Sequence, residues 1–202
     1  MRFSLFGVKV FVSFLAVALL CLTLFMSYTG TEVLMLCLLS AVIHETGHLI
    51  FICKFCGKPD SIAINPGEVR INANLSDISY KLDLLITSAG VLFNFLSSYL
   101  LSLINLFLTS SILYKFVICN LCIGIFNLLP IKTFDGAQFL ANILMRRFSM
   151  RTTDTIINIL TVILIIPIFT AGFYILLVSR YNYNLLLITI YFISIIITKE
   201  MR

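Results

Sequence analysis

Long apolar blocks separated by shorter polar stretches are the dominant pattern of this chain. A block of 18 or more apolar residues is long enough to cross the hydrocarbon core of a bilayer as a helix. The approximate boundaries of six such blocks, of which the last is short, are 8–28, 33–53, 82–108, 112–129, 155–178 and 185–198. The first block is too long for the apolar region of a signal peptide, and no cleavage pattern follows it. The pattern predicts an all-α polytopic membrane protein with about six transmembrane helices.

The polar stretch between the second and third blocks has a different periodicity. Residues 61–64 and 69–75 alternate between apolar and polar side chains, as a half-buried strand does. Residues 65–67 read Asn-Pro-Gly, which is typical of a turn. We predict a small β-hairpin at the cytoplasmic leaflet, with an ordinary loop as the alternative. In a later polar stretch, the apolar residues of 137–147 share one face, which predicts a short interfacial helix.

Composition and charge agree with a membrane protein and indicate its orientation. Hydrophobic residues make up 60% of the chain and charged residues only 11%, whereas a soluble domain has about a quarter charged residues. Of the 14 Lys and Arg, all but Lys115 and Arg180 fall in connections on one side of the predicted spans. Because positive charges favour the cytoplasmic side, both termini are expected in the cytoplasm. No basic cluster interleaved with aromatic residues is present, so we expect no nucleic-acid partner.

No Gly/Ser-rich linker or low-complexity run divides the chain. We therefore expect a single transmembrane domain over residues 1–202. Its expected parts are a core at 32–141 and accessory helices at 8–28, 155–178 and 185–198. The six cysteines include two C-x-x-C pairs, at 53–56 and 119–122. Each pair lies within or at the end of an apolar helix, where cysteine acts as a small hydrophobic residue, and this favours a packing role over a zinc or redox site.

The second apolar block contains His44-Glu45-Thr46-Gly47-His48, an H-E-x-x-H motif. Histidines four residues apart share one face of a helix, so both imidazoles can bind one ion with Glu45 beside it. Zinc favours imidazole nitrogen and lowers the pKa of a bound water to about 7, so an adjacent carboxylate can remove its proton. The chain has two histidines, and both are in this motif. An ionisable side chain inside a span costs about 2.5–3.5 kcal/mol, which favours a functional site over a packed His–Glu pair.

A catalytic zinc site of this kind needs a third protein ligand. Among the nine Asp and Glu residues, Asp135 is well placed because it follows the fourth predicted span. The second and fourth spans are both expected to run from outside to inside, so their ends converge at one leaflet. The Asp135-Gly136 sequence is also typical of a turn or a helix cap. The residues alone leave these two interpretations evenly supported.

Two motifs taken together resemble a known family. The H-E-x-x-H sequence at 44–48, with the Asn-Leu-Leu-Pro sequence at 127–130 and the Asp-Gly at 135–136, resembles the site-2 protease family of intramembrane zinc metalloproteases (peptidase M50). The chain looks most like the branch of the bacterial stage IV sporulation protein FB, which processes pro-sigma-K. The resemblance runs from about residue 34 to residue 141.

The resemblance implies a role for each motif residue. The ligands of one Zn²⁺ per chain would be His44, His48 and Asp135. Glu45 would be the catalytic base, and Asn94, in the sequence Ala-Gly-Val-Leu-Phe-Asn, would help to hold the substrate. Two departures, Val91 where the family commonly has Pro and the absence of a second Pro before the aspartate, touch no ligand.

The resemblance also implies a function. It implies hydrolysis of a peptide bond in a membrane-anchored protein or peptide, within or near the bilayer of a bacterial cell membrane. A sigma-factor precursor is one implied substrate, and a regulatory membrane partner is possible. Within these residues we expect no PDZ-like domain and no nucleotide-binding CBS domain, the second of which is typical of the sporulation branch.

A helical substrate hides its peptide bonds in its own hydrogen bonds. We expect the strand at 69–75 to pair with a locally extended substrate, as a comparable hairpin is thought to do in the family. A CAAX-processing membrane protease is disfavoured because it needs a downstream Glu, and none occurs between Glu68 and Glu200. A non-catalytic membrane metal-binding or partner-binding protein is the alternative from a different class. The intact Glu45 argues against it, since a carrier needs no base beside its ligands.

Overall fold

The computed structural model describes residues 2–5, 8–13, 17, 32–65, 68–72 and 79–179. The predicted sixth span, most of the first span and the turn between the hairpin strands lie outside these residues. The chain divides into two compact units, Met1–Asn127 and Leu128–Arg202. The expectation of a single membrane domain over both units stays a prediction.

Four helices in the described part of the chain are long and apolar enough to cross a membrane. The first unit contains α2 (Glu32–Phe55), α3 (Tyr80–Leu108) and α4 (Ser111–Leu128). The second contains α6 (Met150–Ser179). The predicted second to fifth apolar helices are confirmed, with boundaries within five residues of those expected. The fold is mostly helical, whereas the number of six transmembrane helices stays a prediction.

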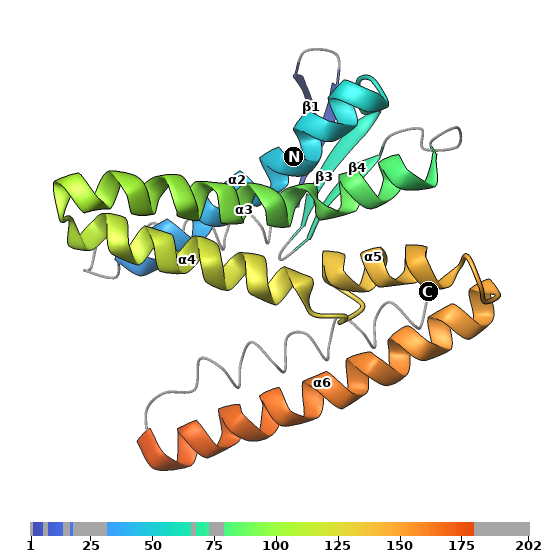
Figure 1. The fold of residues 1–202 in the computed structure, drawn as a ribbon. Coiled ribbons are helices and arrows are strands. Elements are labelled where there is room, and N and C mark those ends of the chain that lie inside the picture. The colour runs from blue at the N-terminus through green and yellow to red at the C-terminus, as the bar shows by residue number, and fades with distance from the viewer. Residues whose placement is uncertain are drawn as a thin grey trace. The chain divides into compact units, whose positions relative to one another are not determined.

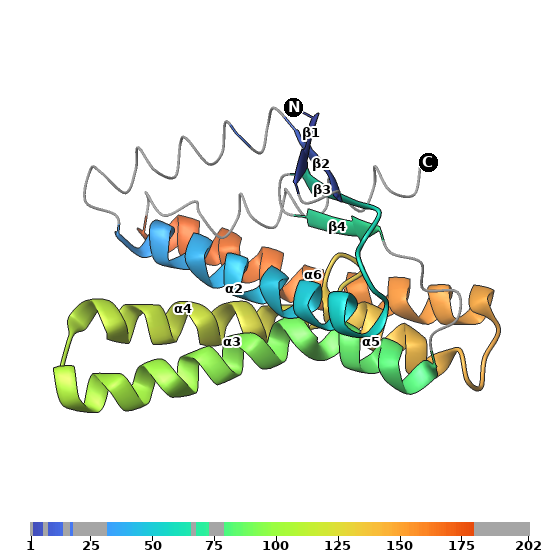
Figure 2. The same ribbon diagram turned by 90° about the horizontal axis from the view of Figure 1, so that it is seen from above.

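A four-stranded sheet completes the first unit, in the spatial order β1-β2-β3-β4. The strands β3 (Ser61–Asn65) and β4 (Glu68–Asn72) form the predicted antiparallel hairpin, with Asn65 opposite Glu68. Figures 1 and 2 both show this sheet beside the carboxyl-terminal part of α2. Because β4 is at one end of the strand order, one of its edges is not paired within the sheet.

The first predicted span begins as a strand, and the helical prediction for its opening residues is wrong. The strands β1 (Arg2–Leu5) and β2 (Val8–Val12) pair antiparallel, and β2 pairs parallel to β3, with Lys9 opposite Ser61. The sequence of β2 is Val-Lys-Val-Phe-Val, which is rich in the β-branched and aromatic residues that fit a pleated surface. The β-structure is therefore a four-stranded sheet, which is larger than the single hairpin that was predicted beside the helices.

Small residues lie where the helices of the first unit pack together. A Cβ added to Gly47 of α2 would lie 2.8 Å from the carbonyl oxygen of Ala89 on α3. A Cβ added to Gly124 of α4 would lie 2.9 Å from the ring of Phe95 on α3. Small residues allow such close approach of helix backbones in membranes. Figures 1 and 2 show the result, with α3 antiparallel to α4 and α2 alongside α3.

Direct contacts also join α2 to α4. The thiol Sγ atoms of Cys37 and Cys119 lie 3.4 Å apart, and the Lys115 ammonium is 3.1 Å from a carboxylate oxygen of Glu32. Large apolar side chains face outward around the bundle, and Phe107 is 88% exposed. Such an apolar exterior suits a lipid environment, because lipid tails cover it without loss of hydrogen bonds.

In the second unit, α5 (Asp135–Leu144) confirms the predicted short helix, and it contacts α6. Its interfacial position in a membrane stays a prediction. The buried side of α6 repeats every four residues, as one face of a helix does. The buried residues of this stripe are Thr153, Ile157, Thr161 and Ile165.

Candidate metal centre

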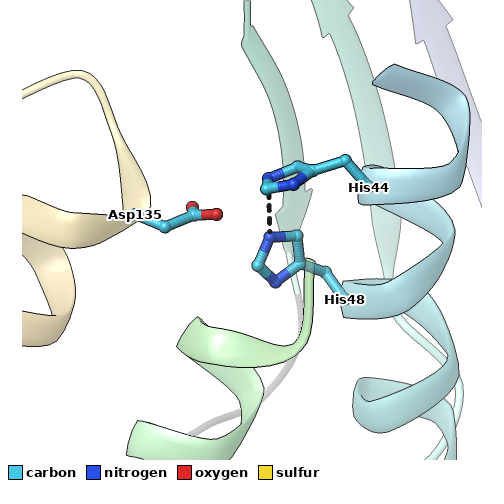
Figure 3. Close-up of side chains that lie close together, drawn as sticks. All are labelled: His44, His48 and Asp135. Atoms are coloured by element: carbon cyan, nitrogen blue, oxygen red, sulfur yellow. Dashed lines mark hydrogen bonds between the residues drawn. The ribbon is translucent and has the colours of Figure 1, made fainter. Parts of the chain in front are cut away.

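Two imidazole rings on α2 face each other, as the H-E-x-x-H spacing predicts. His44 and His48 lie one helical turn apart, with His44 buried and His48 half-buried. Their ring centroids are 4.9 Å apart and their planes are inclined at 76°. The two Nε2 atoms lie 3.3 Å from each other (Figure 3).

The distance between these nitrogens fits a shared zinc ion. Zinc–imidazole bonds are about 2.0–2.1 Å long, and zinc in proteins is close to tetrahedral. Two nitrogens bound to one ion at that length and angle lie about 3.3–3.4 Å apart. The observed 3.3 Å therefore places both Nε2 lone pairs where one zinc ion can take them with little rearrangement of the rings.

The orientation of the His48 ring is set by α3. Its Nδ1 lies 2.8 Å from the backbone carbonyl oxygen of Ile86. A carbonyl oxygen can only accept, so the ring nitrogen must be the donor and carries the proton. This leaves Nε2 as the atom with a free lone pair, which is the tautomer a metal requires.

Gly90 makes room for both rings. A Cβ at this position of α3 would overlap Nε2 of His48, and it would lie 2.6 and 2.7 Å from two atoms of the His44 ring. Gly90 is four residues after Ile86, so one face of α3 both holds His48 and clears the space beside it. Gly90 belongs to the same Ala-Gly-Val-Leu-Phe-Asn sequence as Asn94, but its own role was not predicted. Its position inside a predicted span, where glycine weakens a helix, was the available signal.

Asp135 is the first residue of α5 in the second unit, preceded by Phe134 in an extended conformation. A Cβ added to Gly136 would overlap the Leu128 backbone and lie 2.7 Å from the Leu129 carbonyl oxygen. The glycine therefore allows the first turn of α5 to pack closely against the backbone of Leu128 and Leu129.

The third predicted ligand, Asp135, belongs to the second unit, whereas His44 and His48 belong to the first. That Asp135 binds the same ion as the two imidazoles stays a prediction.

The remaining predicted site residues lie on α2 and α3. Glu45 follows His44 directly and is half-buried. Asn94 lies on α3 and is fully buried, and neither its amide nitrogen nor its amide oxygen has a hydrogen-bond partner among the described residues. An unsatisfied buried amide costs about 1–3 kcal/mol, so these atoms destabilise the fold unless a ligand forms hydrogen bonds with them. Its amide is therefore available to bind a ligand, and its role in holding the substrate stays a prediction.

Comparison with known proteins gives three similarities. Residues 103–169 match the model of the family described as Peptidase family M50. A zinc metalloprotease of Methanocaldococcus jannaschii is 32% identical over 127 residues, which cover 59% of this chain and 37% of that protein. The chain thus spans little more than a third of the length of this curated relative.

A solved structure shares the fold. The site-2 protease from Methanocaldococcus jannaschii has a TM-score of 0.64 and 21% sequence identity, and the match covers 95% of this chain and 91% of that one. At this identity the likeness supports a common fold. The chain is thus similar to peptidase family M50 over residues 103–169, and it shares its fold with a site-2 protease.

Proposed function

We propose that this protein is an intramembrane zinc metalloprotease that hydrolyses a peptide bond of a membrane-anchored protein. The observation that carries the proposal is the pair of Nε2 atoms of His44 and His48, 3.3 Å apart on a helix long and apolar enough to cross a membrane. Glu45 lies between these histidines in sequence, where a carboxylate can serve as a base. The similarity to peptidase family M50 supports the same activity.

In this proposal, His44, His48 and Asp135 hold one Zn²⁺ per chain. When bound, zinc lowers the pKa of a coordinated water to about 7 and polarises the scissile carbonyl. The Glu45 carboxylate would accept a proton from the attacking water and later donate it to the leaving amine nitrogen. Ile86 keeps the His48 ring in the tautomer that exposes Nε2. The Asn94 amide donates a hydrogen bond to the substrate or its developing oxyanion.

The unpaired edge of β4 is the proposed place where the substrate binds in an extended conformation. A transmembrane helix conceals its peptide bonds in internal hydrogen bonds, so it must unwind locally before hydrolysis. Pairing with a sheet edge replaces the lost hydrogen bonds with interstrand ones. The sheet order, in which β4 is terminal, supports this role.

The finer features of the substrate and the cell rest on the sequence. From the family resemblance we propose a membrane-anchored sigma-factor precursor as one substrate and a regulatory membrane partner, and from the distribution of Lys and Arg we propose cytoplasmic termini. Both similar proteins named above come from an archaeon, so the bacterial origin and the sporulation branch stay predictions.

The test is a comparison of wild-type protein with Glu45→Gln in membranes that contain a tethered peptide substrate. The wild type should release a fragment, and Glu45→Gln should abolish turnover while it retains one zinc per chain, because Glu45 is not a ligand. A comparison of membrane proteomes would identify natural substrates as proteins that only the wild type shortens. Full cleavage by Glu45→Gln would disprove the proposed mechanism. Zinc binding without cleavage by either protein would instead support a non-catalytic metal-binding protein.

A further inference from the structure

The side chain of Thr161, in the middle of α6, is hydrogen-bonded to the loop that leads to Asp135. The Oγ1 of Thr161 accepts a hydrogen bond from the Lys132 backbone N–H at 3.0 Å and donates one to the Pro130 carbonyl oxygen at 3.5 Å. A hydroxyl has one proton and two lone pairs, so both bonds can exist at once. Thr161 is therefore the point at which α6 holds this loop.

The surroundings make these hydrogen bonds hard to replace. Thr161 is 2% exposed, and Ile131, which lies between the two bonded loop residues, is 1% exposed. Two further hydrogen bonds lie within the loop, from the Ile131 N–H to the Leu129 carbonyl oxygen and from the Phe134 N–H to the Ile131 carbonyl oxygen. Backbone polar groups buried in an apolar environment need partners, and water has little access here.

We propose that Thr161 is a positioning residue for the metal centre. Its hydroxyl fixes the backbone of residues 130–132, and Lys132 is three positions before Asp135, so this bond sets where the Asp135 carboxylate lies. Gly136 fixes the chain on the other side of Asp135 by its contact with Leu128. The inference rests on the proposed function, because it assumes that Asp135 is a zinc ligand.

The same helix face supplies a matched control. Thr153 lies two turns before Thr161 in the buried stripe of α6 and is 1% exposed. Its Oγ1 has no hydrogen-bond partner among the described residues. Thr153→Val and Thr161→Val therefore make the same change of hydroxyl to methyl at two buried sites of one helix, and only the second removes bonds to the loop.

The experiment measures zinc affinity of the detergent-purified full chain by competition with a chelator, together with thermal unfolding of the zinc-free protein. We expect Thr161→Val to weaken zinc binding by about 10–100-fold, the usual effect of losing a group that orients a ligand. Thr161→Ser keeps the hydroxyl and should bind zinc as the wild type does. Thr153→Val should also bind as the wild type does. Thr161→Ala replaces the valine variant if that variant aggregates.

Each outcome bears on a separate claim. Wild-type affinity in Thr161→Val, with or without a lower unfolding temperature, would show that Thr161 is structural only and would overturn the inference. Equal losses in the serine and valine variants would overturn it too, because the hydroxyl would not be responsible. His44→Ala is the reference for the site itself. If the wild type binds no zinc, or if His44→Ala binds it equally well, the proposed function fails and this inference fails with it.

Discussion

The most direct test of the metal centre is Gly90→Ala, which adds one methyl group on α3 beside both imidazoles. The new carbon would overlap Nε2 of His48 and lie 2.6 and 2.7 Å from the His44 ring. Because non-bonded heavy atoms prefer about 3.5–4.0 Å, the rings must retreat by roughly 1 Å. Metal–ligand distances tolerate only about 0.2 Å. We therefore expect zinc affinity and proteolysis to fall by about 100-fold or more, as for other misplacements of about 1 Å.

The same substitution should change the stability of the protein far less. Replacing glycine by alanine within a helix stabilises it by about 0.8–1 kcal/mol. Overpacking costs about 1–3 kcal/mol. The net destabilisation of the zinc-free protein is then about 0–2 kcal/mol, so the variant should remain folded. The loss of zinc would thus report a local steric effect.

The assay is a zinc titration of the purified variant against a competing chelator, with thermal unfolding of the zinc-free protein in parallel. Gly124→Ala is the matched control, because its added carbon on α4 would lie 2.9 Å from the Phe95 ring and touch neither histidine. It should bind zinc as the wild type does. Unchanged zinc affinity in a folded Gly90→Ala protein would refute the inference that these two rings share an ion at this place.

Three further predictions concern other parts of the chain. Deleting the strand Glu68–Asn72 should abolish cleavage while one zinc per chain stays bound, and intact cleavage would exclude this edge from substrate binding. A thiol oxidant should form a disulfide between Cys37 and Cys119, whose Sγ atoms are 3.4 Å apart. Mass spectrometry should then show a loss of 2 Da that Cys37→Ser prevents. If the disulfide does not form, the packing of α2 on α4 is contradicted. Burial, and then the negative charge of Asp83, raises the pKa of the Cys56 thiol just after α2. Because alkylation requires the thiolate, Cys56 should react slowly at neutral pH and faster as pH rises. Asp83→Asn should lower the pKa of Cys56 and speed its alkylation at a given pH. An unchanged alkylation rate in that variant would refute the charge effect.

The parts of the fold that depend on local pattern were predictable from the sequence. The four described apolar helices follow from runs of hydrophobic residues, and the facing of His44 and His48 follows from their spacing on one helix. The pairing of β3 with β4 is also local, since a two-residue connection joins Asn65 to Glu68. In each case the partners lie close together in the chain, so periodicity and turn residues carry the information.

The parts that depend on distant partners were not predictable. The residues of β2 are apolar enough to extend a predicted span, and only the parallel partner β3 makes them a strand. Gly90 is needed because two rings from another helix occupy its side of α3. Thr161 lies in an apolar run that predicts a helix but does not indicate which loop its hydroxyl holds. Such roles arise from packing between helices and strands that are distant in the chain, and this packing cannot be inferred from a single sequence.

The parallel pairing of β2 with β3 has a consequence for biosynthesis. Lys9 leaves the ribosome long before its sheet neighbour Ser61, with the whole of α2 between them. At about 5–20 residues per second, the gap lasts several seconds. During that interval the β1–β2 ribbon has an unpaired edge, and an unpaired edge can capture another nascent chain. The sheet therefore cannot close before Ser61 has been synthesised, and slow synthesis of the intervening residues lengthens the time for which the β2 edge is unpaired.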